Sequence, residues 1–183
     1  MQWKVSGFTI VELVVVIILL GILAATALPR FIDIDEEAHE ATFAAVQGSL
    51  QTGVSLFRAQ WMAQGQPGAN TTFADFDNLR NNASGFPYGT VDNGGGTSNV
   101  TTAADCAAVF TNVHQAGAPS VTTAAASNQV DASGDGFDFT AVVNVPNCEY
   151  YHSAESTTVG DIIGVLAYDS TTGQVTAGTY TLD

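Results

Sequence analysis

The chain opens with a long apolar run. Residues 8–28 read FTIVELVVVIILLGILAATAL, and Glu12 is the single charged side chain among them. At a rise of about 1.5 Å per residue, a helix of this length crosses the roughly 30 Å hydrocarbon core of a bilayer. A short polar stretch, residues 1–7, precedes the run and carries Lys4, a positive flank typical of a segment that stays cytoplasmic. The pattern therefore predicts a transmembrane helix over residues 8–28.

A second helical pattern follows Pro29. Small and apolar residues recur there at spacings of three and four, as on a packed helix face: Phe31, Ile34, Ala38, Ala41, Ala45, Ser49, Thr52 and Leu56. The sequence Gly-Gln-Pro-Gly at residues 65–68 is a strong stop signal, so the helix is expected to end near Met62. The two patterns together predict one long helix whose C-terminal half packs on a globular head.

The rest of the chain is typical of a small α+β head. Residues 66–135 are rich in Gly, Asn, Thr, Ser and Ala, with turn signals at 86–89 and 92–96 and a short predicted helix over 103–113. Strand-like runs follow at 137–145, 148–152, 161–168 and 175–182, and a hairpin at 169–173 is expected to join the last two. The predicted architecture is an antiparallel sheet laid on a helix.

Charge and cysteine content narrow the choice of function. Four basic residues stand against 18 acidic ones, giving a net charge of −14. Such a surface repels phosphate, so neither nucleic-acid binding nor docking onto anionic lipid is expected. The only cysteines, Cys106 and Cys148, form an even count that could close one loop in an oxidising compartment.

The junction Gly7-Phe8-Thr9-Ile10-Val11-Glu12 resembles the prepilin cleavage motif of type IV pilins and pseudopilins. The resemblance extends to Gly21 and Pro29, and the seven-residue leader resembles the type IVa class. It implies that a membrane peptidase cuts after Gly7 and methylates the new terminus, Phe8. An ordinary secretory signal cleaved near Ala24 and Ala25 is the alternative.

The resemblance also implies a division of the chain and a type IV pilin fold. Residues 1–7 form the cleaved leader, 8–28 the transmembrane and assembly half of the N-terminal helix, and 29–183 the amphipathic half with the head. The stretch from Gly21 to Pro29 is either a simple proline kink or a segment that loses helicity in filaments, and the two readings stay open.

Glu12 is the residue that separates a plain anchor from an assembly device. A carboxylate inside a bilayer costs about 2.5–3.5 kcal/mol, so it needs a partner. Glu12 lies four residues from Phe8, where it can meet the α-ammonium of the same helix. In the family the same carboxylate is proposed to meet the ammonium of a neighbouring subunit. The alternative is that Glu12 merely reaches the headgroups from its place near the mature terminus.

The C-terminal half has a looser resemblance to mannose-sensitive haemagglutinin-type pilins, carried by the cysteine pair, the Phe-Pro-Tyr-Gly turn and the closing hairpin. A disulfide between Cys106 and Cys148 is expected to stabilise the head. Two predicted strands follow Cys148, so the loop does not enclose the last segment as it does in many pilins.

One loop has the spacing of a calcium site. Oxygen ligands occur at alternate positions before a glycine, as in the front half of a calcium-binding loop; the candidates are Asp131, Ser133 and Asp135, with the Phe137 carbonyl and Asp138 nearby. The same residues are also ordinary turn formers, which is the competing interpretation. The three histidines lack metal-site spacing. No other cofactor is expected.

The acidic residues after Pro29 have two interpretations. They lie on the faces of the second helical segment that the apolar stripe leaves, and are Asp33, Asp35, Glu36, Glu37 and Glu40. Either they form a solvated surface, or they contact Arg30, Arg58 or Arg80 of neighbouring subunits.

The predicted function is a structural subunit, a major pilin, of an extracellular filament for adhesion, attachment or motility. Its expected partners are other copies joined through the N-terminal helices, the prepilin peptidase, the assembly machinery, and the inner membrane before assembly. No serine-hydrolase elbow, phosphate loop or Cys-x-x-Cys pair occurs, so no enzymatic activity is expected. A type II secretion pseudopilin and a membrane-tethered periplasmic binding domain are the alternatives.

Overall fold

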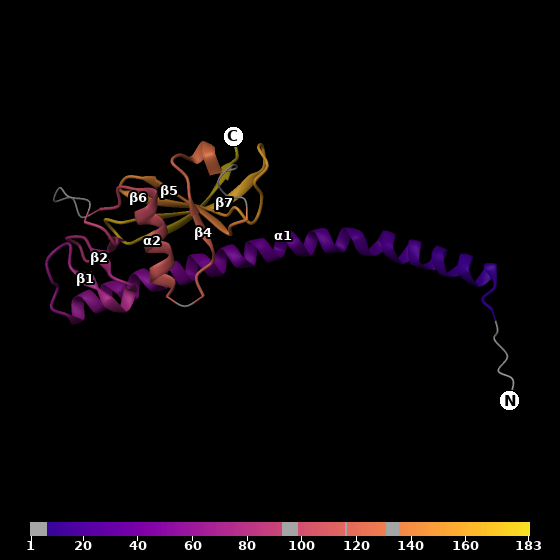
Figure 1. The fold of residues 1–183 in the computed structure, drawn as a ribbon, viewed down its shortest axis with the longest axis horizontal. Coiled ribbons are helices and arrows are strands. Elements are labelled where there is room, and N and C mark those ends of the chain that lie inside the picture. Colours follow the sequence, from indigo (N-terminus) through magenta and orange to yellow (C-terminus); the bar gives the residue numbers. More distant parts are fainter. Residues whose placement is uncertain (1–6, 93–98, 116, 131–135) are drawn as a thin grey trace, which may run out of the picture. The chain divides into compact units, whose positions relative to one another are not determined.

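The computed structural model describes residues 7–92, 99–115, 117–130 and 136–183, with the side chains of 27–36 excepted. The chain divides into two compact units, residues 1–41 and 42–183. Helix α1, Ile10–Ala63, contributes to both (Figure 1). The α+β class predicted from the sequence is confirmed, and the head in residues 42–183 combines one further α-helix with two sheets.

Helix α1 ends where the stop signal places it. The Gly65 N–H donates to the Met62 carbonyl at 3.1 Å, and the Gln66 N–H donates to the Trp61 carbonyl at 3.0 Å. Gly65 has a φ of 82°, a left-handed conformation that glycine adopts without a steric penalty. These bonds form a Schellman motif, which satisfies carbonyls that the helix end would otherwise leave unpaired.

The buried face of α1 differs from the stripe predicted from the sequence. The residues that enter the core of the head are Val46, Leu50, Val54, Phe57 and Trp61. The predicted positions Ala45, Ser49, Thr52 and Leu56 are exposed instead, so that prediction was wrong by one position around the helix. The physical reason is side-chain size, because burying Leu, Val and Phe removes far more apolar area from water than burying Ala or Ser. Phe31 and Ile34 lie outside the residues whose side chains are described.

A small sheet occupies part of the segment that was expected to be loops. Strands β1 (Thr72–Phe73), β2 (Leu79–Asn81) and β3 (Pro87–Gly89) pair antiparallel in that order, with a 3₁₀ turn, η1 (Ala74–Phe76), between the first two. Their apolar side chains fill one end of the main core; those buried are Phe73, Phe76, Leu79 and Tyr88.

Helix α2, Ala103–His114, confirms the helix predicted over 103–113. A capping box starts it: the Thr102 hydroxyl accepts the Asp105 N–H at 3.1 Å, and the Asp105 carboxylate accepts the Thr102 N–H at 2.9 Å. One face of α2 is buried in the main core through Cys106, Val109 and Phe110. The cap and this apolar stripe together account for a stable helix of this length.

The main sheet has five strands in the order β4-β5-β6-β7-β8. Their bounds are β4 Val121–Thr123, β5 Phe139–Asn144, β6 Asn147–Tyr151, β7 Ile162–Asp169 and β8 Val175–Thr181. The last four match the predicted strands and pair antiparallel. The short strand β4 was not predicted, and it pairs parallel to β5, so the sheet is not wholly antiparallel.

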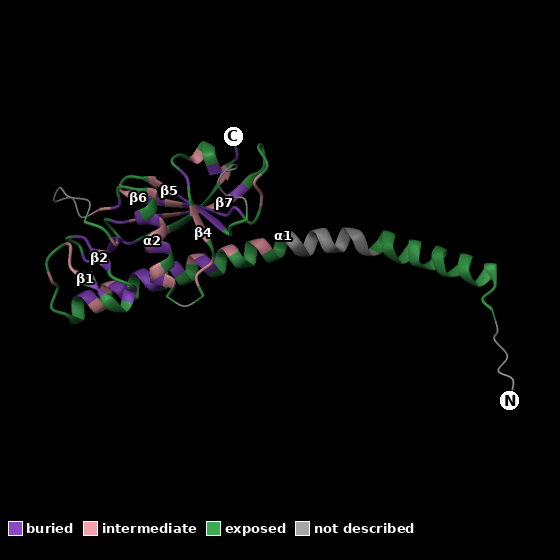
Figure 2. Ribbon diagram, in the orientation of Figure 1, coloured by how far each residue is buried: buried purple, intermediate pink, exposed green. Residues whose placement is uncertain are grey.

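Each face of this sheet carries its own apolar cluster. One cluster joins the sheet to α2 and the buried face of α1 through Phe139, Ala141 and Leu166. The second lies among Val142, Ile163 and Leu182, with residues from the connection between β4 and β5, including η2 (Ser127–Gln129) and the following Val130. In Figure 2 the buried colouring is concentrated on the central strands and on the part of α1 within the head. The sheet is therefore a two-sided platform.

The predicted hairpin between β7 and β8 is present. The Gly173 N–H donates to the Asp169 carbonyl at 2.8 Å, and the Asp169 carboxylate accepts from the hydroxyls of Thr171 at 2.6 Å and Thr172 at 2.9 Å. Partial burial raises the pKa of the Asp169 carboxyl, but these hydrogen bonds outweigh it and hold that pKa below its usual value. The turn is therefore best satisfied while Asp169 is ionised.

The structure confirms the disulfide between Cys106 and Cys148. The Cα atoms are 5.3 Å apart, and both residues are fully buried. The bond joins α2 to β6, and the Tyr150 hydroxyl adds a 2.9 Å hydrogen bond to the Cys106 carbonyl. Complete burial raises the pKa of Tyr150 well above its ordinary value, so this donor keeps its proton.

We predict opposite effects for two glycines of α1. A Cβ at Gly53 would lie 2.4 Å from the Val113 carbonyl oxygen of α2, whereas a Cβ at Gly48 would meet no atom within 4 Å. Gly53→Ala should lower the free energy of unfolding by about 1–3 kcal/mol, because backbone has to move. Gly48→Ala should raise it by about 0.5–1 kcal/mol through helix propensity. Urea unfolding of both variants tests this, and equal effects would contradict the close approach of the helices.

Removing the disulfide should destabilise the head. The two cysteines are 42 residues apart, and closing a loop of that length is worth about 4 kcal/mol at most. The Cys106→Ala/Cys148→Ala variant should therefore unfold at lower urea concentration than the oxidised protein. A reductant should shift the wild-type protein in the same direction and leave the double variant unchanged. An unchanged midpoint in the double variant would refute this stabilising role.

Candidate assembly and processing site

A capping box closes the N-terminal end of α1. The Glu12 carboxylate accepts the Thr9 backbone N–H at 2.9 Å and the Thr9 hydroxyl at 2.8 Å. In return the Glu12 N–H donates to the Thr9 hydroxyl oxygen at 3.3 Å, and the Leu13 N–H donates to the Thr9 carbonyl at 3.2 Å. Thr9 is thus the N-cap residue, and Glu12 stands at the third helical position, where such a carboxylate satisfies an otherwise unpaired donor.

The sequence analysis expected a partner for Glu12 but did not identify Thr9 as that partner. The expected partner was the Phe8 α-ammonium, which does not exist while residues 1–7 are attached, because the Phe8 nitrogen is then a peptide nitrogen. The signal for the cap was present in the sequence, since Thr-x-x-Glu before an apolar run is a capping-box pattern. Both hydrogen bonds to the carboxylate end on Oε2. The geometry therefore leaves Oε1 for another donor.

The junction between Gly7 and Phe8 lies just before the helix. Both residues are exposed, Phe8 to 82%, and neither belongs to a helix or strand. A Cβ built on Gly7 would meet no atom of the described residues within 4 Å. Packing among the described residues therefore does not require a glycine at position 7. The peptide bond is accessible to another molecule.

Apart from Glu12, the first turns of α1 are apolar on every side. From Ile10 to Leu23 the large apolar side chains are between 42% and 81% exposed, in contrast to the fully buried Leu50 and Phe57 (Figure 2). A helix of this composition has to be covered by other protein surfaces or to lie in lipid, because water alone does not favour so much exposed apolar area. Among the residues that the structure describes, no helix is both long and apolar enough to cross a membrane. The expected span, 8–28, runs into residues 27–36, whose side chains are not described.

The two other predicted assembly positions are a glycine and a proline of α1. Gly21 is exposed, and a Cβ built on it would meet no atom within 4 Å. A glycine inside a helix costs about 1 kcal/mol relative to alanine, and no contact of the described chain compensates for it. The side chain of Pro29 lies outside the described residues.

Both arginines of the head make contacts within their own chain. The Arg58 guanidinium carbon lies 4.2 Å from the centre of the Phe86 ring, a cation–π distance. Arg80 donates to the Thr90 carbonyl at 3.1 Å and to the carbonyl and side-chain oxygens of Asn70 at 3.0 Å. Their contact with acidic residues of neighbouring subunits therefore stays a prediction. Arg30 has no described side chain.

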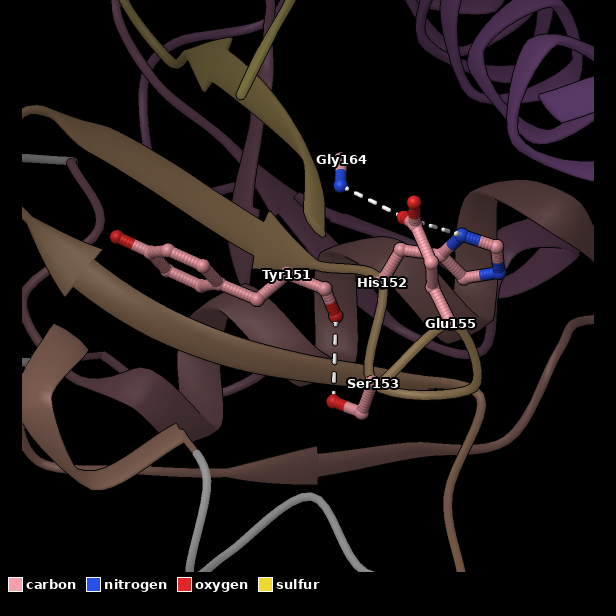
Figure 3. Close-up of polar contacts among 5 residues, drawn as sticks. All are labelled: Tyr151, His152, Ser153, Glu155 and Gly164. Atoms are coloured by element: carbon pink, nitrogen blue, oxygen red, sulfur yellow. Dashed lines mark hydrogen bonds and ion pairs between the residues drawn. The ribbon is translucent and has the colours of Figure 1, made fainter. Parts of the chain in front are cut away.

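The buried histidine of the head belongs to its core. His152 is stacked on Phe139 with ring centres 5.0 Å apart, and its Nδ1 lies 3.6 Å from the Glu155 carboxylate. That carboxylate also accepts the Gly164 N–H at 2.9 Å, so Glu155 lies between the ring and β7 (Figure 3). The neighbouring Ser153 hydroxyl donates to the Tyr151 carbonyl at 3.3 Å. This network fixes the end of β6.

The calcium hypothesis is not tested by the structure. Asp131, Ser133 and Asp135 lie outside the described residues. The Asp138 carboxylate accepts the backbone N–H and hydroxyl of Ser120 at 2.8 and 2.7 Å, which ties β5 to the start of β4. Phe137 is 41% exposed. Within the described parts of the chain, no group of three or more His, Cys, Asp or Glu residues is arranged to hold a metal ion.

Two comparisons with known proteins bear on this site. The family model of the prokaryotic N-terminal methylation motif matches residues 4–28, which include Gly7, Phe8 and Glu12. Over 72 residues the chain is 35% identical to the type IV narrow pilus major component PilA5 of Thermus thermophilus. That match covers 39% of this chain and 60% of the relative, so it spans less than two thirds of that protein. No solved structure matches. The two matches confirm the resemblance to type IV pilins.

Loss of the Thr9 hydroxyl should weaken the first turn of α1. Thr9→Ala removes both the acceptor for the Glu12 N–H and one donor to its carboxylate, at a cost of about 1 kcal/mol. Hydrogen exchange of the amides in the first turn should therefore accelerate about fivefold in the uncut chain. Thr9→Ser keeps the hydroxyl and should exchange like wild type. Equal rates in all three proteins would show that the cap does not stabilise the helix.

Proposed function

We propose that the chain is a structural subunit, a major pilin, of an extracellular type IV filament that serves adhesion, attachment or motility. The observation that carries the proposal is the methylation motif at the start of a helix that is apolar on every side. A surface of that kind is suited first to lipid and then to identical helices of other subunits. The likeness to a pilus major component supports the same conclusion.

Processing is proposed to change the partner of Glu12. In the uncut chain the carboxylate caps α1 through Thr9. Cleavage after Gly7 by a prepilin peptidase would convert the Phe8 nitrogen into an ammonium, and methylation would keep it protonated near neutral pH. That ammonium can approach Oε1, the oxygen that the cap does not use. The cap therefore holds the carboxylate in place until the cation is made.

The charge of Glu12 is proposed to set the register between subunits. In the inner membrane, and later among packed helices, an unpaired carboxylate would cost several kcal/mol. Lys4 leaves with the leader, and Arg30 is 18 residues from Glu12, which is about 27 Å along a helix. The ammonium of Phe8 is the cation left at this depth, in the same subunit or in a neighbour. Subunits entering the filament through the assembly machinery would stop where the two charges meet.

Gly21 is proposed to serve contact between subunits. The residue weakens its own helix and contacts nothing in its own chain that requires glycine. Small residues let neighbouring helices approach closely in apolar surroundings. A glycine here, with Pro29 eight positions on, also supports local loss of helicity during assembly.

Two substitutions of Glu12 separate the cap from the charge. Glu12→Gln keeps an oxygen that can cap the helix but removes the negative charge, whereas Glu12→Val removes both. Both variants should insert into the membrane and be cut after Gly7. Both should then accumulate in the inner membrane and form few filaments, because the ammonium has no counter-charge. Subunits are counted by immunoblot of sheared surface fractions and of membranes.

The other outcomes are informative. Wild-type numbers of filaments from Glu12→Gln would refute the charge-register mechanism and leave capping as the role of Glu12. An uncut Glu12→Gln precursor would instead assign the residue to recognition by the peptidase. The absence of filaments from cells that make the wild-type chain abundantly, together with an uncut leader, would refute the proposed function itself and favour a tethered binding domain.

A further inference from the structure

Strand β8 is the outermost strand of the main sheet and has one described strand neighbour. It is seven residues long and pairs with β7 in an unbroken register from Ile162↔Thr181 to Tyr168↔Val175. Four consecutive residues, 176–179, are exposed. At the opposite edge, β4 has only three residues. The sheet therefore presents one long regular edge.

The hydrogen bonds at the two ends of β8 show which residues face outward. Beside the strand, Gln174 and Leu182 bond toward β7: the Gln174 carbonyl accepts the Asp169 N–H at 3.0 Å, and the Leu182 N–H donates to the Asp161 carbonyl at 2.9 Å. The Val175 N–H instead donates to the Gln51 side chain of α1 at 2.9 Å, on the side away from β7. In an antiparallel ladder these two directions alternate residue by residue. The backbone groups of Ala177, Thr179 and Thr181 therefore point away from β7.

Gln51 of α1 occupies the start of this edge at Gly173 and Val175, but from Ala177 onward the edge lacks the features that usually prevent strand addition. The sequence of β8, VTAGTYT, contains no charged residue and no proline, and its register with β7 shows no bulge. Natural edge strands are normally protected by such features. The neutrality stands out in a chain with 18 acidic and 4 basic residues, where most exposed surfaces of two copies would repel each other.

We propose that β8 is a self-association edge that pairs antiparallel with β8 of a second copy of this chain. The register that fits is centred on Gly178, so that Ala177 and Thr179 of one copy lie opposite Thr179 and Ala177 of the other. These are the residues whose backbone groups point outward, and they exchange hydrogen bonds. Gly178 meets the second Gly178 as a non-hydrogen-bonded pair, where the strands come closest.

The occupant is a second copy because the same edge is its own complement. The pairing covers Ala177 to Thr179, because Gln51 of α1 occupies Gly173 and Val175, and the acidic Asp183 therefore lies beyond the paired segment. A partner strand that contains Asp or Glu would instead bring carboxylates to the contact. The pairing is isologous, with the same patch on both partners, which a two-fold axis allows.

The biological consequence rests on the proposed function. A filament repeats this edge along its length, and antiparallel pairing related by a two-fold axis joins subunits of two neighbouring filaments. Each contact is weak, but once one pair of subunits has bound, the neighbouring pairs of the same two filaments are held at a high effective concentration, so the filaments bind each other tightly. The edge therefore makes filaments bundle laterally.

Cysteine cross-linking tests the pairing on the full-length chain in detergent, so the result does not depend on filament formation. Opposed Cα atoms of a non-hydrogen-bonded pair are about 4.5 Å apart, within the range for a disulfide. A Cβ at Gly178 lies 3.6 Å from Val165 Cγ1, an ordinary contact, so Gly178→Cys should fold. On mild oxidation it should give at least tenfold more covalent dimer than Thr172→Cys, an exposed control in the hairpin.

A second pair of variants tests the backbone itself. In the Gly178→Cys background, Thr179→Pro removes an N–H that points away from β7, so it spares the ladder of the subunit while blocking the edge. Dimer yield should fall at least tenfold, whereas Thr179→Ala should leave it unchanged. Equal cross-linking of Gly178→Cys and Thr172→Cys, no cross-link in either, or a Thr179→Pro yield equal to that of Thr179→Ala would overturn the proposal.

Discussion

The fold depends on the burial of one face of α1 against the head. Val46, Leu50, Val54, Phe57 and Trp61 enter the main core, and each large side chain of this kind contributes about 1.5–3 kcal/mol when fully buried. Because Gly53 removes a Cβ where α2 crosses, the two helices come close enough to share that core. The head is thereby built around the C-terminal part of the same helix that begins just after the N-terminal motif.

The main sheet packs against α1 within the head and supports it there. Its one face packs on α1 and α2, the disulfide joins α2 to β6, and the second apolar cluster covers the other face. A sheet of this kind needs regular hydrogen bonding between its strands, and its outermost strand is then left with one unpaired side. The outermost strand β8 is consequently both part of the scaffold and the place where we propose that another strand is added.

Much of this could be predicted from the sequence because the responsible patterns are local. The stop signal at Gly65 predicted the end of α1, and strand-like runs between turn signals predicted the four long strands. Strands β1 to β4 have only two or three residues each, too few for any period to appear. The stripe on α1 was placed one position off because Ala45 and Ser49 fit the helical spacing as well as Val46 and Leu50 do. Only the head shows which set is buried.

The candidate site, too, could be predicted only where its features are local in the sequence. Gly7, Phe8 and Glu12 were found from a local motif, and the family match to residues 4–28 agrees with it. The capping role of Thr9 is equally local, but the sequence analysis paired Glu12 with the Phe8 ammonium instead. Partners in a filament belong to other chains, so neither the sequence nor a single chain's packing can give their positions.

The central claim is that the mature subunit begins at Phe8 and keeps the apolar helix. Intact-mass spectrometry of filaments sheared from the cell surface tests it most directly. The account predicts a subunit that lacks residues 1–7 and carries one methyl group on Phe8. A subunit that retains Met1 to Gly7, or one that begins after Ala25, would contradict it.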